Sequence, residues 1–347
     1  VGRPLYPRGK YAGLDSGVDM GGSLAVRARR DPADVFGGCR LGGDCAGAVA
    51  GRADGVCGTA GGVLVLSEAF VTDGCTVFRA ALASGSVREK TRASRWAVAV
   101  GLQAVDQWSV SERLLELAHQ HTTGHLTLEA VRRRGSDYWL ERRTEETTLA
   151  DKTAVNIVGF LSEKRRPCRL TVTDYLRVHT AVFAGVFPFA GTIRTCNLTK
   201  AEPVLAGDTV RYADCREIAA ALDYDLSQER RFSYVGLDES GTIRHLAAFA
   251  ANLWQIHAFR EGNTRTTFLF LDRYLRGKGR TPDDRVPASH VRFLRDSLVK
   301  AVYEDRRRGI AADSSDLERF FRAWLLGEAL ADGHNAVYED GNKGQME

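Results

Sequence analysis

Residues 256–265 bring together, in one short stretch, the groups that phosphate chemistry needs. His257 can accept a proton, because a neutral imidazole with a pKa of about 6.5 suits general-base work at neutral pH. Glu261 offers one carboxylate, which is enough for Mg²⁺ because this ion is held by one or two carboxylates together with phosphate oxygens. Residues 262–264 and Arg265 add backbone amides and a cation. This set predicts phosphoryl or nucleotidyl transfer.

Two helices must position this cluster, one on each side of it. Upstream, apolar residues recur at the spacing of a helix with one buried face: Leu246, Phe249, Ala250, Leu253 and Trp254. Downstream, residues 265–276 are apolar nearly all round, which is typical of a buried helix. The cluster is therefore predicted to be a loop that opens a central helix. The first amides of that helix lack intrahelical partners and lie at its positive end, where phosphate binds well.

The same stretch resembles the signature of the Fic (Fido) family. That signature reads His-Pro-Phe-x-Asp/Glu-Gly-Asn-Gly-Arg and has a second Arg after two intervening residues. The matching positions are His257, Phe259, Glu261, Gly262, Asn263 and Arg265. The departing positions are Ala258 in place of Pro, Thr264 in place of the second Gly, and Phe268 in place of the second Arg.

A second stretch resembles the family's Tyr-Pro-Trp-Ala-Gly-x-Ile-Arg segment and the target-docking flap that follows it. It reads Phe-Pro-Phe-Ala-Gly-Thr-Ile-Arg from Phe187 to Arg194. Both motifs occur in the order that the family has, and the resemblance covers about residues 145–326. It agrees with the helical periodicity of the chain in predicting an all-α fold, a Fic-type helical bundle with a small β-hairpin flap.

The resemblance implies that the protein transfers AMP from ATP to a Ser, Thr or Tyr hydroxyl of a target protein. His257 would take the proton from this hydroxyl as it attacks the α-phosphate. Glu261 would hold Mg²⁺ against the α- and β-phosphates. ATP and Mg²⁺ are therefore the expected cofactors. A toxin-like protein with a separate antitoxin-type inhibitor as a partner is also implied.

The remaining roles carried over concern phosphate and target binding. The phosphate-binding residues would be Gly262, Asn263, Thr264 and Arg265, with Arg265 neutralising the leaving pyrophosphate. The flap residues would dock the target main chain as an added strand: Asn197, Leu198, Thr199 and Lys200.

The departures from the signature lead to three expectations. Thr264 is β-branched, so it would disturb the turn if the turn needs a positive φ at this position. Phe268 would weaken ATP binding by removing a cation, unless its ring points into the helical core. The chain also lacks the Ser/Thr-x-x-x-Glu-Gly/Asn pattern of the family's inhibitory helix. We therefore expect no regulation by such an internal helix.

Three classes of function stay open on the sequence alone. The first is the AMP transferase described above. The second is a related phosphotransferase or other nucleotidyl transferase. The third is a catalytically impaired Fic-like interaction protein.

Composition divides the chain into parts. Residues 1–105 are crowded with Gly, Ala, Val and Arg and show no sustained helix or strand period, so we expect a disordered or loosely packed extension whose removal leaves the core intact. Residues 106–144 are expected to be a helical lead-in and residues 145–328 the Fic domain. Residues 329–347 are expected to be a polar tail.

Charge and cysteine content limit which partners and which cellular compartment we expect. The formal net charge of +4 is small for 347 residues, so nucleic acid is not required as a partner. The seven cysteines lack regular spacing and are read as reduced thiols. No apolar run approaches the ~20 residues of a membrane span. We therefore expect a cytoplasmic protein with no membrane partner.

Histidines outside the motif have simpler interpretations. His179 falls on the apolar stripe of a predicted helix that Thr171 begins as a cap. A histidine there is more often a hydrogen-bonded core residue than a ligand. His121 and His125 would share a helix face, but Thr122–Gly124 favours a break and solvated side chains over a metal site.

Overall fold

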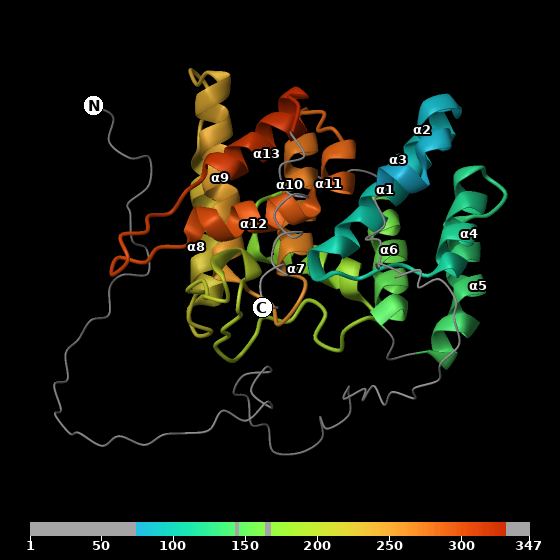
Figure 1. The fold of residues 1–347 in the computed structure, drawn as a ribbon, viewed down its shortest axis with the longest axis horizontal. Coiled ribbons are helices and arrows are strands. Elements are labelled where there is room, and N and C mark those ends of the chain that lie inside the picture. Colours follow the sequence, from blue (N-terminus) through green and yellow to red (C-terminus); the bar gives the residue numbers. More distant parts are fainter. Residues whose placement is uncertain (1–73, 143–145, 164–167, 331–347) are drawn as a thin grey trace, which may run out of the picture.

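The computed structural model describes residues 74–142, 146–163 and 168–330, and these form an all-α structure (Figure 1). The predicted helical fold is confirmed. The elements are α1 Gly74–Val77, α2 Arg79–Ser84, α3 Val87–Gly101, η2 Leu102–Asp106, α4 Glu112–Thr122, α5 Leu128–Glu141, α6 Glu146–Ser162, α7 Val172–Phe183, η3 Pro203–Leu205, α8 Ile218–Arg231, α9 Glu239–Ile256, α10 Asn263–Gly277, α11 Arg285–Ser289, α12 Val291–Val302 and α13 Ser315–Leu326. None of the helices in these ranges is long and apolar enough to cross a membrane.

Helices α9 and α10 flank the motif loop, and α10 lies in the middle of the view in Figure 1. α9 packs against α8, α12 and α13, and α10 packs against α7 and α9. Helices α3 to α6 form the other side of the molecule, which α7 and η2 join to α10. α9 begins sharply because the carboxylate of Asp238 accepts a hydrogen bond from the Gly241 amide at 2.7 Å. The motif loop between α9 and α10 is thus held by two helices that are packed on several sides.

The flap between α7 and α8 is an extended loop with one antiparallel bridge, between Ala201 and Thr209. The expected β-hairpin is therefore reduced to a single bridge. The tip is occupied by η3, which begins at Pro203, and the two residues after it, Ala206 and Gly207, have positive φ. Proline lacks an amide hydrogen, so this position cannot extend a ladder.

The expectation of a loose extension through residue 105 is wrong for residues 74–105. These residues form α1, α2, α3 and most of η2, and α3 packs against α4, α6 and α11. The ring of Trp96 is completely buried, and its indole NH donates to Nδ1 of His121 at 2.9 Å. Phe78 is also fully buried. Removal of residues 1–105 would therefore remove part of the core.

The composition of α3 explains why its pattern was missed. Its buried face consists mainly of small residues, and Gly101 lies so close to α11 that an added Cβ would be 2.1 Å from the carbonyl oxygen of Ala288. The start of the helix does carry a signal, because Ser86 and Glu89 form a capping box. Residues 1–73 and 331–347 lie outside the described residues.

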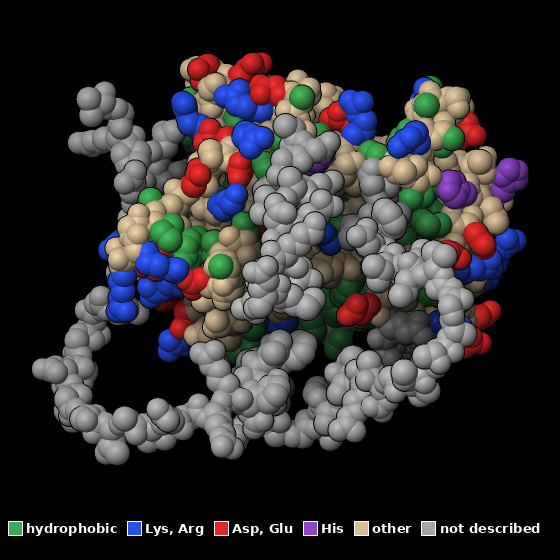
Figure 2. Space-filling view, viewed as in Figure 1, with side chains coloured by type: hydrophobic (Ala, Val, Ile, Leu, Met, Phe, Trp, Pro, Cys, Tyr) green, Lys and Arg blue, Asp and Glu red, His purple; other side chains and the backbone are tan. Residues whose placement is uncertain are grey.

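Acidic and basic side chains are interspersed over the face drawn in Figure 2. His119 and His125 are exposed at the end of α4, and Nδ1 of His125 lies 2.7 Å from the Thr123 hydroxyl. Among the described residues, no group of three or more His, Cys, Asp or Glu side chains could hold a metal ion. The interpretation of these histidines as solvated side chains agrees with the structure, except that His121 is buried.

Candidate active site

His257 marks the point where α9 ends and the motif loop begins. Its backbone is left-handed, with φ 50° and ψ 59°, and its amide donates to the carbonyl of Trp254 at 3.0 Å. A non-glycine residue in this region is strained and is typical of functional positions. The loop closes at Gly262, whose φ is 79°. An added Cβ at Gly262 would lie 2.3 Å from the ring of Phe183, so only glycine fits.

The imidazole of His257 is buried and stacks on the ring of Tyr212 at a centroid distance of 3.9 Å. Among the described residues its Nδ1 has no hydrogen-bond partner. Burial lowers the pKa of His257 well below its usual value, and the nearby charges of Arg295, Lys200 and Arg194 lower it further. The ring is therefore neutral at neutral pH, which is the form that can accept a proton.

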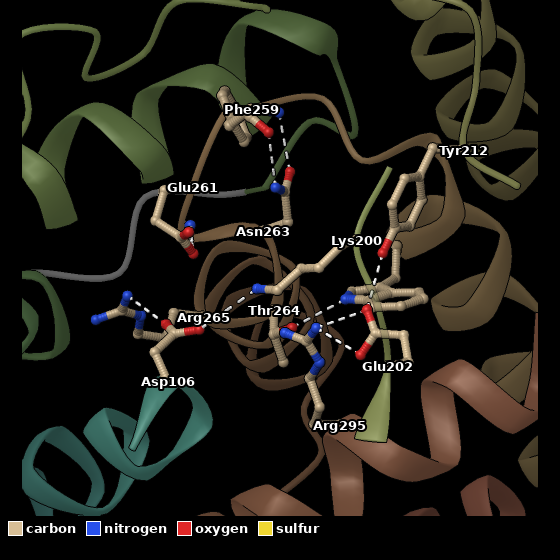
Figure 3. A network of polar contacts seen from close by, with 12 residues as sticks. Asp106, Lys200, Glu202, Tyr212, Phe259, Glu261, Asn263, Thr264, Arg265 and Arg295 are labelled. Carbon is tan, nitrogen blue, oxygen red and sulfur yellow. Dashed lines mark hydrogen bonds and ion pairs between the residues drawn. The ribbon is translucent and has the colours of Figure 1, made fainter. Parts of the chain in front are cut away.

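Asn263 holds the shape of the motif loop. Its Oδ1 accepts from the amide of Phe259 at 2.9 Å, and its Nδ2 donates to the carbonyl of the same residue at 2.8 Å (Figure 3). We expected Asn263 to contact phosphate, but in the structure its amide group is engaged by the loop itself. Glu261 is half-buried, and its Oε1 accepts from the Gly262 amide at 2.9 Å.

Thr264 lies in the first turn of α10 and has an ordinary helical backbone. We expected threonine to disturb the turn only if the turn needed a positive φ at this position, and this condition is not met, because the positive φ belongs to Gly262. The Thr264 hydroxyl accepts a hydrogen bond from the indole NH of Trp254 at 2.9 Å. The residue that departs from the family signature thus ties α10 to α9.

Arg265 is fully buried and faces η2. It donates to the carboxylate of Asp106 at 2.6 Å and to the side chain of Gln103 at 3.0 Å. Its guanidinium also lies over the ring of Trp108 at 4.6 Å. In this conformation Asp106 compensates the charge that we expected to face pyrophosphate.

Most of the predicted motif residues and Lys200 meet around one small cavity, whereas Arg265 does not line it. Its lining is Val105, Asp106, Lys200, His257, Glu261, Gly262, Asn263, Thr264 and Arg295. About 10 Å³ is free inside it, which is roughly the room that one water molecule requires. Lys200 closes one side through a 4.0 Å ion pair with Asp106. A nucleotide therefore needs these two side chains to separate.

The other predicted flap residues do not line the cavity. The side chain of Asn197 accepts from the Cys215 amide at 2.8 Å and so joins the two arms of the flap. Leu198 is half-buried and Thr199 is exposed. This alternation of exposure is typical of an extended segment.

The sequence analysis missed four residues of the site: Asp106, Arg295, Glu202 and Tyr212. Arg295 on α12 makes two contacts to the Glu202 carboxylate, at 2.8 and 2.9 Å (Figure 3). Tyr212 completes the chain by donating to Glu202 at 3.0 Å while its ring stacks on His257. The available signal was a charged residue, Arg295, within the apolar stripe of its helix.

His179 joins the two sequence motifs. Its Nδ1 accepts from the Gly191 amide at 2.7 Å, and its Nε2 lies 3.1 Å from the carbonyl oxygen of Glu261. The ring stacks on Phe259 at 3.8 Å. Burial lowers the pKa of His179 to about 4. His179 is thus a hydrogen-bonded core residue, as its place on an apolar stripe predicted.

Phe268 points away from the cavity and into the core. Its side chain is buried, and its ring centroid lies 4.9 Å from that of Trp324 on α13. Of the two alternatives for this position, the structure shows the core residue. Position 268 of α10, where the family signature has its second Arg, therefore supplies no cation to the cavity. Arg295 approaches the cavity from α12.

Comparison with known proteins finds a match to one family model and matches to solved structures, one of which is described here. The crystal structure of the N-terminal FIC domain of Bep8, a VirB-translocated Bartonella effector protein from Bartonella sp. 1-1C, is similar at 15% identity and a TM-score of 0.40. That match covers 52% of this chain and 86% of the other. No curated protein matches. The model of the Fic/DOC family matches residues 169–275, which contain both motifs, and we call these matched residues the Fic/DOC segment.

Proposed function

We propose that this protein transfers AMP from ATP to a hydroxyl side chain of a target protein. The observation that supports this most is the neutral, buried imidazole of His257, whose Nδ1 has no partner among the described residues. It lies beside the N-terminus of α10, where free amides favour phosphate. Arg295 and Lys200 add positive charge to the same cavity.

The residues that line the cavity fit the groups that the reaction needs. His257 takes the proton of the target hydroxyl while its oxygen bonds to the α-phosphorus and the bond to pyrophosphate breaks. Glu261 is the residue that would hold Mg²⁺, which supplies charge neutralisation on the phosphates when bound. The amides at the start of α10 and the Arg295 guanidinium bind phosphate oxygens.

Entry of ATP requires the flap and η2 to move apart. The 10 Å³ cavity has no room for a nucleotide, and Lys200 and Asp106 close it. Their ion pair is long, and 41% of the Lys200 side chain is exposed, so breaking it costs little. The exposed part of the flap remains available for a target main chain.

The cytoplasm is the compartment that suits this reaction. The four cysteines of the described residues form no disulfide with one another, and ATP is abundant there. A separate antitoxin-type protein is a partner that fits this function.

A non-catalytic interaction protein is the second candidate, and the closed cavity with its Asp106–Arg265 pair is the observation that favours it. Incubation of the protein and a lysate with ATP labelled at the α- or the γ-phosphate separates the candidates. Transfer of the α-label to protein supports AMP transfer, and transfer of the γ-label means phosphorylation. If neither label moves and calorimetry detects no ATP binding, the protein is the non-catalytic form.

A further inference from the structure

A second hollow lies at the C-terminal end of α10, away from the motif loop. Its volume is about 480 Å³, within the ~300–1,000 Å³ that is typical of small-molecule sites. It is formed by the loop between α8 and α9, by α9 and by the end of α10. Because α10 has 15 residues, the hollow is roughly 20 Å from His257.

The walls of this hollow are aromatic and are held rigidly from behind. Tyr234 and Tyr274 each donate a 2.6 Å hydrogen bond to Oε1 of Glu229, which is buried. Nε2 of His245 lies 2.6 Å from the other oxygen of Glu229, and Phe232 stacks on the His245 ring at 3.4 Å. The polar ends of the tyrosines are therefore engaged inside the protein, so ring surface is left to line the hollow. A site that is already fixed in shape loses little entropy on binding.

The rim of the hollow is cationic. Lys278 and Arg280 are exposed, and neither forms an ion pair with any described residue. The amides of Lys278, Gly279 and Arg280 donate to the last carbonyls of α10, which reduces the negative charge at this helix end. The ammonium of Lys278 lies 5.7 Å from the centroid of the Tyr274 ring.

We infer that this hollow binds a small aromatic anion, a ligand with one flat ring and a phosphate or carboxylate. The ring would lie among Phe232, Tyr234 and Tyr274, and the anionic group would face Lys278 and Arg280. A ring without an anionic group would contact only the aromatic walls, and an anion without a ring would contact only the cationic rim. This site is independent of the proposed transfer reaction.

Calorimetric titration of the full chain with phenyl phosphate and phenylacetate tests the inference. Phenol and inorganic phosphate serve as the two half-ligands. At least one of the complete probes should bind about ten-fold tighter than either half-ligand, the effect of one charge-assisted hydrogen bond. The outcome that overturns the inference is that neither complete probe binds tighter than phenol and inorganic phosphate do.

Substitutions of the two rim residues test whether the probe binds in this hollow. The double variant Lys278→Gln/Arg280→Gln changes exposed side chains, so it should fold normally and weaken the probe about ten-fold. Arg244→Gln, at an exposed position of α9 outside the hollow, is the matched control and should bind like the wild type. Unchanged affinity in the double variant would place the probe elsewhere and contradict the inference.

Discussion

The two ends of α10 are both buried and polar, but they differ in how their polar groups are satisfied. At the N-terminal end His257 is strained, and its Nδ1 lacks a partner among the described residues. At the other end Glu229 accepts hydrogen bonds from Tyr234 and Tyr274 and contacts His245. Buried polar groups are nearly always paired. The first end thus leaves a buried nitrogen without a partner among the described residues, whereas the second end uses its buried polar groups to hold the fold behind the hollow.

His257→Ala should have the largest effect at the N-terminal end. Loss of a general base lowers the transfer rate ~10²–10⁴-fold, while ground-state affinity for ATP changes little. Labelled-ATP transfer and calorimetry measure the two quantities. Alanine also carries a Cβ, so the left-handed backbone at this position is not relieved, and loss of the buried ring that stacks on Tyr212 leaves a cavity. The melting temperature should therefore fall, and transfer is compared at a temperature at which both proteins are folded. Undiminished transfer by the variant would remove His257 from the mechanism.

Glu229→Ala, at the other end, should act through stability. Burial raises the pKa of Glu229, but hydrogen bonds from His245, Tyr234 and Tyr274 outweigh burial and lower it overall, so the group is charged and paired. Its removal should lower the free energy of unfolding by about 3–5 kcal/mol, as breaking a buried ionic network does. Chemical denaturation measures this. Glu239→Ala, at an exposed position of α9, is the matched control, and an equal effect in both variants would contradict the role of Glu229.

Phe268→Arg tests whether this position belongs to the motif end or to the core. The structure places Phe268 against Trp324, so an arginine there would bury an unpaired charge at a cost of about 3 kcal/mol. Phe268→Leu keeps the position apolar and should cost less. Denaturation curves compare the two variants. Tighter ATP binding by a stable Phe268→Arg protein would show that the side chain reaches the phosphate site.

Acid should weaken the fold at two buried histidines, His179 beside the motif loop and His121 in α4, before most carboxylates titrate. Burial lowers the pKa values of His179 and His121 to about 4 in the folded state, whereas the unfolded value is about 6.5. The unfolded state therefore binds more protons between these values, and stability falls as pH drops from about 6.5 toward 4. The pKa difference of each histidine corresponds to a loss of about 3 kcal/mol over the whole window. Chemical denaturation at several pH values measures how the free energy of unfolding depends on pH. This dependence should be weaker in His179→Asn, and an unchanged dependence would mean that His179 does not contribute.

Thr264→Val should give the smallest effect. It keeps the β-branched shape but removes the oxygen that accepts from the Trp254 indole. Leaving this buried donor without a partner should cost about 1–2 kcal/mol. Thr264→Ser keeps the hydroxyl and is the control. Equal melting temperatures for the two variants would show that the hydrogen bond adds nothing.

The parts of the site that are contiguous in sequence could be predicted, and the parts that meet only in the fold could not. Glu261, Gly262 and His257 lie in one loop between two periodic stretches, so their proximity is built into the chain. Asp106 and Arg295 come from η2 and α12, on either side of the Fic/DOC segment. No local sequence pattern shows that Arg295 on α12 faces the flap.

The same limit applies to the fold. The amphipathic stripe of α12 predicts its buried face because it is built from Val291, Leu294 and Leu298. The first described helices were missed because α3 buries mostly alanine and valine beside one tryptophan, which resembles low-complexity sequence. A helix that buries small side chains shows little difference in hydrophobicity between its buried and exposed positions. Such side chains nevertheless pack closely and exclude water as well as large side chains do.

The ion pair between Arg265 and Asp106 has a consequence for where a folding unit begins. Arg265 lies inside the Fic/DOC segment at 0% side-chain exposure, while Asp106 lies outside it, in η2. A fragment cut at the edges of the segment would leave a guanidinium buried without its counter-charge. The region that a family shares is therefore smaller than the region that must fold together, and in this chain the smallest autonomous unit includes η2.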